Sequence, residues 1–268
     1  MKELLVFFWL TYLISWIIWL PLYGHIFGLN NLPIVPYQHT IGALSPLIAS
    51  LLTTWIFLKK DGLKKLLAKC FQIKPFIYFV IALLGPFILA LLAAIISYFI
   101  NNTPISFSGF AITKEFPQFN LLAYFIYYII FIGFGEEVGW RSFALPRLQN
   151  KMNTLSASIV LTLFWALWHL PLFFYREGFT SMQITGIFGW VFSLLTGRVL
   201  LTWLYNSSKV SILICAVFYS TIDIAFTANF ADKNIVNYIG FLITVWGIMT
   251  IIIFKPKSLS STMIEIKI

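Results

Sequence analysis

Long apolar blocks, separated by short polar segments, make up most of the chain's 268 residues. Each block holds about 20 residues, the length that an α-helix needs to cross the hydrocarbon core of a bilayer. The ten-residue alternation of apolar and polar positions that indicates membrane β-strands does not occur. The pattern predicts an all-α integral membrane protein with eight spans, at residues 4–24, 40–58, 76–100, 121–147, 154–175, 182–206, 210–230 and 236–254.

Composition supports a membrane protein and leaves no room for a soluble domain. The chain is 60% hydrophobic and 10% charged, whereas a soluble domain carries about 25% charged residues. The first apolar run is too long for a signal-peptide core and lacks a small-residue cleavage pattern, so we expect it to remain as the first span. We therefore predict a single polytopic domain, residues 1–268, that crosses the plasma membrane several times and has the lipid bilayer as a partner.

The distribution of basic residues predicts the orientation. With the N-terminus in the cytoplasm, fifteen of the 18 lysines and arginines fall in inner loops and tails, Arg141 and Arg198 among them. Only Lys114, Arg176 and Lys233 fall outside. This bias predicts that both termini are cytoplasmic. The net charge of +9 is explained by topology signals, so no nucleic-acid partner is expected.

The inner loop 59–75, KKDGLKKLLAKCFQIKP, alternates lysines with apolar residues at helical spacing. Its apolar positions include Leu66 and Phe71. This pattern is typical of a short amphipathic helix that lies on anionic lipid.

Few ionisable residues lie inside the predicted spans. Three acids, Glu136, Glu137 and Asp223, and one histidine, His169, are well inside them, whereas His39 flanks the first external loop and is expected to be solvated. A charged side chain at the bilayer centre costs about 2.5–3.5 kcal/mol, so such residues indicate a functional site.

The segment GEEVGWR carries the two adjacent glutamates. Glu137 and Arg141 are four residues apart on one helix face, while Glu136 is rotated about 100° away. The spacing predicts that Arg141 neutralises Glu137 and that Glu136 faces a cavity, where a carboxylate can act as a general base. A purely structural Glu–Arg pair without chemistry is the alternative. Glycines at 133, 135 and 139 predict close packing against a neighbouring helix.

Two further segments place polar side chains on helix faces. In FWALWHLP, Trp165 and His169 share a face; in VFYSTID, Tyr219 and Asp223 do so. Hydrogen bonds between helices are the alternative explanation for each. Together with the glutamates, these faces predict one interior pocket.

These segments resemble the CAAX prenyl protease and bacteriocin-processing family, also called CPBP or Abi. The segment GEEVGWRSFALPRLQ resembles its first motif, EExxxR, and FWALWHLP resembles its second, FxxxH followed by Leu-Pro. The stretch LLTGRVLLTWLYNSSKVSILICAVFYSTID resembles the approach to its last motif, HxxxN or HxxxD. The likeness covers about residues 121–230, keeps the family's order of motifs and fits its eight-helix fold.

The resemblance implies roles for these side chains. Glu136 would activate water together with His169, and the positions of Tyr219 and Asp223 would hold the oxyanion. The pair Glu137 and Arg141 would order the first motif. This sequence departs from the pattern at two positions: Trp165 stands where the motif has Phe, and Tyr219 stands where it has a second histidine.

No cofactor is expected. A catalytic zinc usually needs three protein ligands, and the sequence offers one histidine in the spans and no HExxH. Zinc is the alternative, because members of the family are often described as metalloproteases.

We therefore predict an intramembrane endopeptidase that cleaves a peptide or protein substrate in or at the membrane, such as a prenylated or leader peptide. The alternative, kept open by Tyr219, is an inactive family member that binds a peptide or partner, for example in bacteriocin self-immunity. A transporter is disfavoured because no internal repeat is visible.

Overall fold

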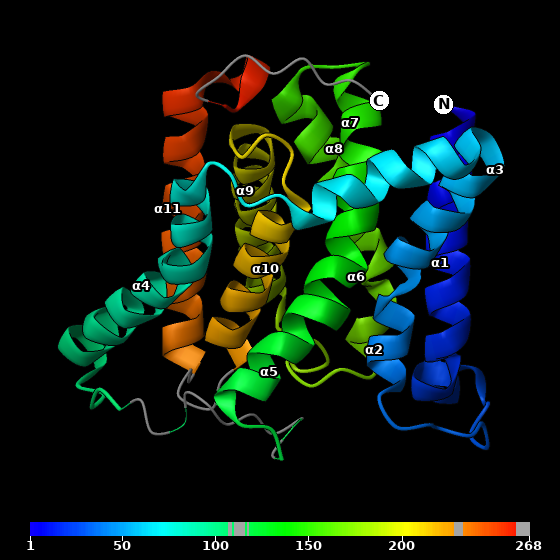
Figure 1. Ribbon diagram of the computed structural model, residues 1–268. Helices are drawn as coiled ribbons and strands as arrows, with labels where there is room; N and C mark the ends of the chain where they lie inside the picture. Colours follow the sequence, from blue (N-terminus) through cyan, green and yellow to red (C-terminus); the bar gives the residue numbers. More distant parts are fainter. Residues whose placement is uncertain (107–108, 110–115, 117, 228–232, 261–268) are drawn as a thin grey trace.

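The computed structural model describes residues 1–106, 109, 116, 118–227 and 233–260 of the chain. Every regular element in these residues is helical. The long helices run roughly side by side and form one bundle (Figure 1). The predicted all-α architecture is confirmed.

The bundle is built from helices of unequal length. The long ones are α1 (Lys2–Tyr23), α3 (Ser45–Ala68), α4 (Phe76–Asn101), α8 (Thr154–Trp168), α9 (Ile184–Ser207), α10 (Ile212–Thr227) and α11 (Lys233–Ser258). Short elements are α2 (Gln38–Ala43) and the 3₁₀ turns η1 (Gly24–Phe27), η2 (Lys69–Phe71) and η5 (Leu170–Phe174). One continuous rod joins α5 (Leu121–Tyr127), the π-helical η3 (Tyr128–Gly133), α6 (Phe134–Glu137), the π-helical η4 (Val138–Ala144) and α7 (Leu145–Gln149).

Seven helical stretches in the described residues are long and apolar enough to cross a membrane. The remaining predicted span corresponds to α10, which has 16 residues and is shorter than the roughly 20 that a crossing needs. The start of α1 and the end of α11 lie at the same end of the bundle (Figure 1), as an even number of crossings requires. The count of eight and the cytoplasmic location of the termini stay predictions.

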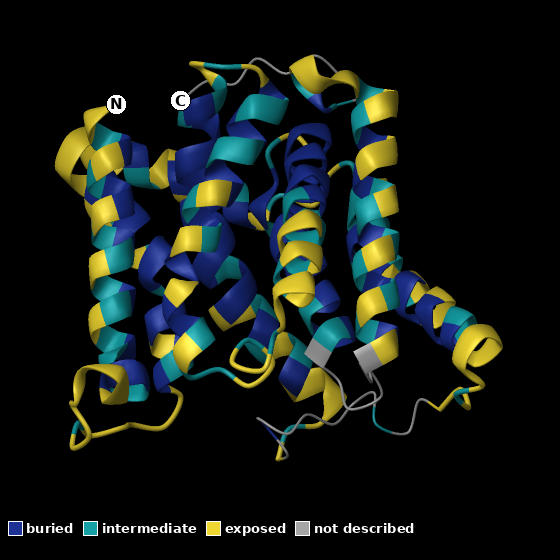
Figure 2. Ribbon diagram, turned by 180° about the vertical axis from the view of Figure 1, so that it is seen from behind, coloured by how far each residue is buried: buried dark blue, intermediate teal, exposed yellow. Residues whose placement is uncertain are grey.

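The outer faces of the helices have the composition of a lipid-facing surface. Figure 2 shows exposed positions along the outward faces and buried ones on the inward faces. On α1, the exposed positions Leu5, Trp9 and Ile17 are 60%, 70% and 60% exposed. Large apolar side chains on an outer face are what a helix in a bilayer presents.

The loop that follows the second predicted span is helical, as its pattern predicts. The backbone of α3 leaves the helical region at Lys59, where φ is 53° and ψ is −150°, and the remaining turns cross the end of the bundle (Figure 1). Phe71 is 81% exposed, but Leu66 is 5% exposed because it packs into the protein. Contact of this segment with lipid stays a prediction.

Small residues bring neighbouring helices against the rod that carries the glutamates. A Cβ atom on Gly139 would lie 2.4 Å from the Pro46 carbonyl oxygen, and one on Gly133 would lie 2.7 Å from that of Ala216. Neither position can hold a larger side chain without moving α3 or α10. The predicted close approach at these glycines is confirmed.

Candidate active site

The two adjacent glutamates lie in α6, a short α-helical piece between two π-helical segments. Glu136 is 3% exposed and Glu137 is 0% exposed. π-Helical turns are rare and occur often at functional sites, because the extra residue redirects side chains. The sequence pattern did not predict these turns.

Glu137 is paired with Arg141 in the way that their spacing predicts. Arg141 Nη1 donates to both carboxylate oxygens of Glu137, at 2.6 Å each. Both side chains are buried. The pair therefore sits inside the bundle, where a lone charge would be costly.

Glu136 receives hydrogen bonds from two other helices. The Tyr219 hydroxyl on α10 donates to Oε1 at 2.9 Å, and the Trp165 indole N–H on α8 donates to Oε2 at 2.6 Å. Three of the predicted site residues thus meet at one carboxylate. Trp165 was expected only to fill the aromatic position of the motif, whereas the structure makes it a direct partner of Glu136.

His169 caps α8 next to this cluster and is 7% exposed. Its Nδ1 lies 3.0 Å from the Trp165 carbonyl oxygen, and the two ring centroids are 3.6 Å apart. Within the described part of the chain, no hydrogen bond joins His169 directly to Glu136, and Trp165 contacts both side chains. Asp223 is one turn beyond Tyr219 on α10 and is partly buried.

Arg198 is also part of this cluster, and the sequence pattern did not identify it as a site residue. It lies within α9 and is 5% exposed. Its Nη1 is 3.2 Å from Glu137 Oε1, and its Nη2 is 3.8 Å from Glu136 Oε2. Its guanidinium carbon lies 3.7 Å from the Trp165 ring centroid and 4.7 Å from that of Tyr219.

The assignment of Arg141 and Arg198 to the inner loops was therefore wrong. Both are buried in helices, and thirteen basic residues remain on the predicted inner side against three outside. The signal that could have identified Arg198 is its position inside the predicted span 182–206, because an arginine among apolar residues is as costly there as a glutamate.

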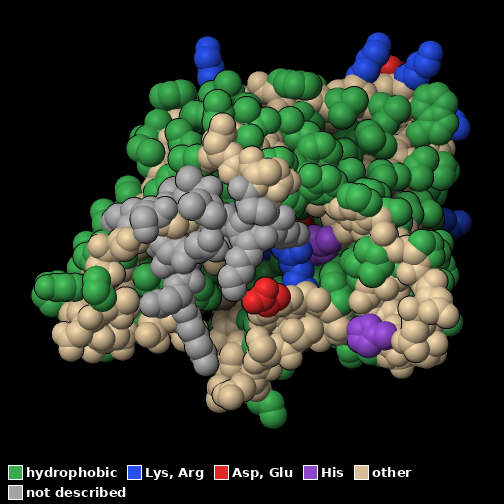
Figure 3. Space-filling view, turned by 90° about the horizontal axis from the view of Figure 1, so that it is seen from below, with side chains coloured by type: hydrophobic (Ala, Val, Ile, Leu, Met, Phe, Trp, Pro, Cys, Tyr) green, Lys and Arg blue, Asp and Glu red, His purple; other side chains and the backbone are tan. Residues whose placement is uncertain are grey.

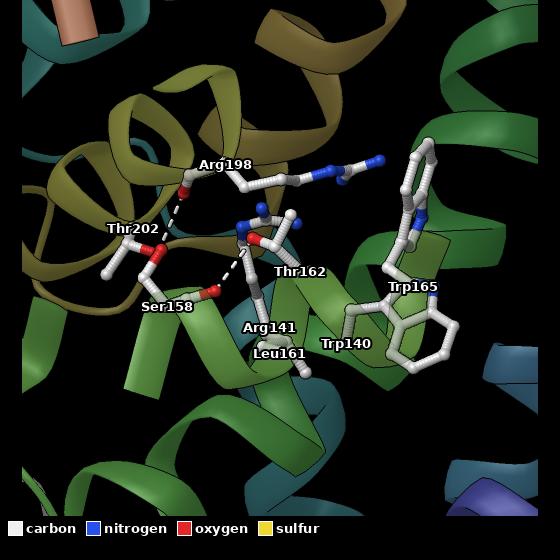
Figure 4. Close-up of a pocket in the computed structure, with 8 residues that line it drawn as sticks. All are labelled: Trp140, Arg141, Ser158, Leu161, Thr162, Trp165, Arg198 and Thr202. Atoms are coloured by element: carbon white, nitrogen blue, oxygen red, sulfur yellow. Dashed lines mark hydrogen bonds between the residues drawn. The ribbon is translucent and has the colours of Figure 1, made fainter. Parts of the chain in front are cut away.

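A narrow pocket lies between η4, α8 and α9, and both arginines of the cluster line it (Figure 4). It is lined by Trp140, Arg141, Ser158, Leu161, Thr162, Trp165, Arg198 and Thr202. The Thr162 hydroxyl donates to the Ser158 carbonyl oxygen at 2.7 Å, and the Ser158 and Thr202 hydroxyls are 3.0 Å apart. The Ser158 and Thr202 hydroxyls therefore bond to each other, whereas the Thr162 hydroxyl bonds to the backbone.

A second histidine departs from its expected environment. His39, in α2, is partly buried and hydrogen-bonded within the protein. Its Nδ1 lies 2.8 Å from the Tyr175 hydroxyl, and its ring stacks on Trp19 with centroids 5.4 Å apart. Viewed from the end opposite the termini, acidic, basic and histidine side chains lie together near the middle of this face, and histidine atoms also lie toward its edge (Figure 3).

A catalytic zinc at Glu136 would need further protein ligands close to this carboxylate. Among the described residues, no group of three His, Cys, Asp or Glu side chains could hold a metal ion. Both oxygens of Glu136 already accept hydrogen bonds within the protein, and His169 is the one histidine beside it. Three protein ligands are the usual minimum.

Comparison with known proteins matches the region that holds the site. Residues 118–225 match the family model described as type II CAAX prenyl endopeptidase Rce1-like. CAAX prenyl protease 2 of Methanococcus maripaludis is 31% identical over 93 residues, which are 33% of this chain and 34% of that protein. The chain thus spans about a third of the length of this curated relative. These matches confirm the family resemblance inferred from the three motifs.

Proposed function

We propose that this chain is an intramembrane endopeptidase in which Glu136 activates water, because residues 118–225 match the family model described as type II CAAX prenyl endopeptidase Rce1-like. The observation that carries the proposal is a buried carboxylate that receives side-chain hydrogen bonds from α8 and α10 inside the matched region. Such a group is costly inside a membrane protein and is retained where it does chemistry.

Glu136 acts as the general base. It takes a proton from water as the water oxygen attacks the scissile carbonyl, and it returns that proton to the leaving amine as the C–N bond breaks. His169 lies across Trp165 from this carboxylate and helps to hold the water. No covalent bond between enzyme and substrate is required.

The tetrahedral intermediate carries a negative oxygen that needs a donor in a water-poor site. The Tyr219 hydroxyl and the protonated form of the Asp223 carboxyl, on one face of α10, donate hydrogen bonds to this oxygen. In the resting arrangement the Tyr219 hydroxyl donates to Glu136, so it must turn from the base to the oxyanion during the reaction. This movement of the Tyr219 hydroxyl couples the general base to the oxyanion position.

The substrate is a peptide or protein segment in or at the membrane. The relative from Methanococcus maripaludis is a CAAX prenyl protease, so a prenylated C-terminal peptide is the first candidate, and a leader peptide is the second. Purified protein in liposomes should cleave a farnesylated peptide faster than its unmodified counterpart. Equal rates would reject the prenylated class, and a lack of cleavage of any membrane peptide would reject the enzyme.

A second function has a specific observation in its favour. Tyr219 replaces the histidine of the family pattern, and both oxygens of Glu136 are hydrogen-bonded within the protein. An inactive member that binds a peptide or partner would have these features as well. It would bind membrane peptides without producing new termini.

Hydrolysis should not require a metal. Since no three His, Cys, Asp or Glu side chains among the described residues are grouped so that they could hold a metal ion, we expect turnover to survive strong chelators. The measurement is peptide cleavage before and after chelation, together with elemental analysis of purified protein. One zinc per chain that disappears in His169→Ala would contradict the metal-free mechanism.

A further inference from the structure

Arg198 lies between two aromatic rings and two carboxylates. Its guanidinium is within 3.7 Å of the Trp165 ring centroid and 4.7 Å of that of Tyr219. The same group reaches Glu137 at 3.2 Å and Glu136 at 3.8 Å. An arginine stacked on aromatic faces and paired with carboxylates gains from both kinds of contact.

The two departures from the family pattern converge on this arginine. Trp165 supplies an indole N–H to Glu136, which a phenylalanine could not do. Tyr219 supplies a hydroxyl to the other oxygen of the same carboxylate. Since both rings also contact Arg198, the directions of both donors depend on where its guanidinium lies.

We propose that Arg198 is a positioning residue, which fixes Glu136 for hydrolysis directly and through the two aromatic side chains stacked on it. The inference rests on the proposed function, in which Glu136 is the base. The motifs of the family resemblance give no role to this position. Arg198 itself does not have to touch the substrate.

Lysine could not replace this side chain. A guanidinium is planar, so its faces can meet both rings while its nitrogens point to separate carboxylates. The observed contacts use both features, because Nη1 and Nη2 approach different glutamates. A lysine ammonium is a compact point charge and would keep the charge while losing the stacking.

The charge of Arg198 is also needed. Glu136, Glu137, Arg141 and Arg198 are all buried, and Arg141 already pairs with Glu137. Removal of Arg198 therefore leaves Glu136 without its nearest cation, and an uncompensated buried charge is strongly destabilising.

The first test does not depend on catalysis. The thermal unfolding midpoint is measured in detergent for wild type, Arg198→Met, Glu136→Gln and the double variant. We expect Arg198→Met to lower the midpoint and the added Glu136→Gln to recover part of the loss, because residues in contact do not act additively. Strictly additive effects would overturn the link between Arg198 and Glu136.

The second test separates positioning from folding. Arg198→Lys should lower kcat per folded molecule by about 10²-fold, with little change in KM, since a small displacement of a catalytic group costs about that much. The matched control is Arg147→Lys, because Arg147 also pairs with a glutamate, Glu3 at 2.7 Å, and lies 3.7 Å from the Phe143 ring. The control should keep wild-type kcat.

The outcomes of these tests are distinguishable. A lower folded yield for Arg198→Lys with unchanged kcat per folded molecule would overturn the positioning role and leave a structural one. If wild-type protein hydrolyses nothing, the proposed function fails, while the unfolding midpoints still decide whether Arg198 holds Glu136.

Discussion

Glu136→Gln should lose peptide hydrolysis by about 10²–10⁴-fold, the contribution typical of a general base. The amide cannot take a proton from water, so the attacking nucleophile is no longer activated. Folding should persist, because the amide oxygen can still accept one of the two hydrogen bonds that now reach the carboxylate from Trp165 and Tyr219.

The measurement is turnover of a membrane peptide per folded molecule, with the folded fraction taken from size-exclusion chromatography. Glu3→Gln is the matched control, since Glu3 is paired with Arg147 at 2.7 Å and lies outside the site. Its turnover should equal that of wild type. Full activity in Glu136→Gln would remove the glutamate from the mechanism.

Tyr219→Phe should lower turnover by about 10²–10³-fold, the usual loss when one oxyanion donor is removed. The phenyl ring keeps the contact with Arg198, so the change removes the hydroxyl alone. Because this hydroxyl acts on the reacting atoms and not on the remainder of the substrate, KM should change little.

A matched tyrosine provides the control for this variant. Tyr23 and Tyr219 are each 8% exposed, and the Tyr23 hydroxyl donates to the Trp16 carbonyl oxygen away from the site, at 3.0 Å. Tyr23→Phe should keep wild-type turnover. If Tyr219→Phe is as fast as wild type, the oxyanion role is wrong. If activity arises only in Tyr219→His, the inactive alternative holds.

The fold followed from the sequence because lipid imposes a strict rule on it. Backbone groups inside a bilayer must be hydrogen-bonded within the segment, so long apolar blocks can only be helices. Local departures from regular α-helix could not be predicted from the sequence in this way. The break of α3 at Lys59 and the two π-helical turns around α6 depend on tertiary packing, for which the hydrophobic pattern carries no signal.

The acidic part of the site was predictable because buried carboxylates stand out among apolar neighbours. The spacing of Glu137 and Arg141 also gave their pairing, which the structure shows. The place of Arg198 in the site was not predicted, because basic residues are interpreted as topology signals even where they lie inside a predicted span. Its contacts with Trp165 and Tyr219 join three helices, and no local pattern encodes such a meeting.

Glutamate-dependent hydrolysis is tested most directly by comparing newly formed protein N-termini in membranes that carry wild-type protein and in membranes that carry Glu136→Gln at equal folded levels. The predicted result is at least one N-terminus, within or next to a membrane segment, that occurs only with wild type. Identical sets of N-termini in the two membranes would contradict endopeptidase activity.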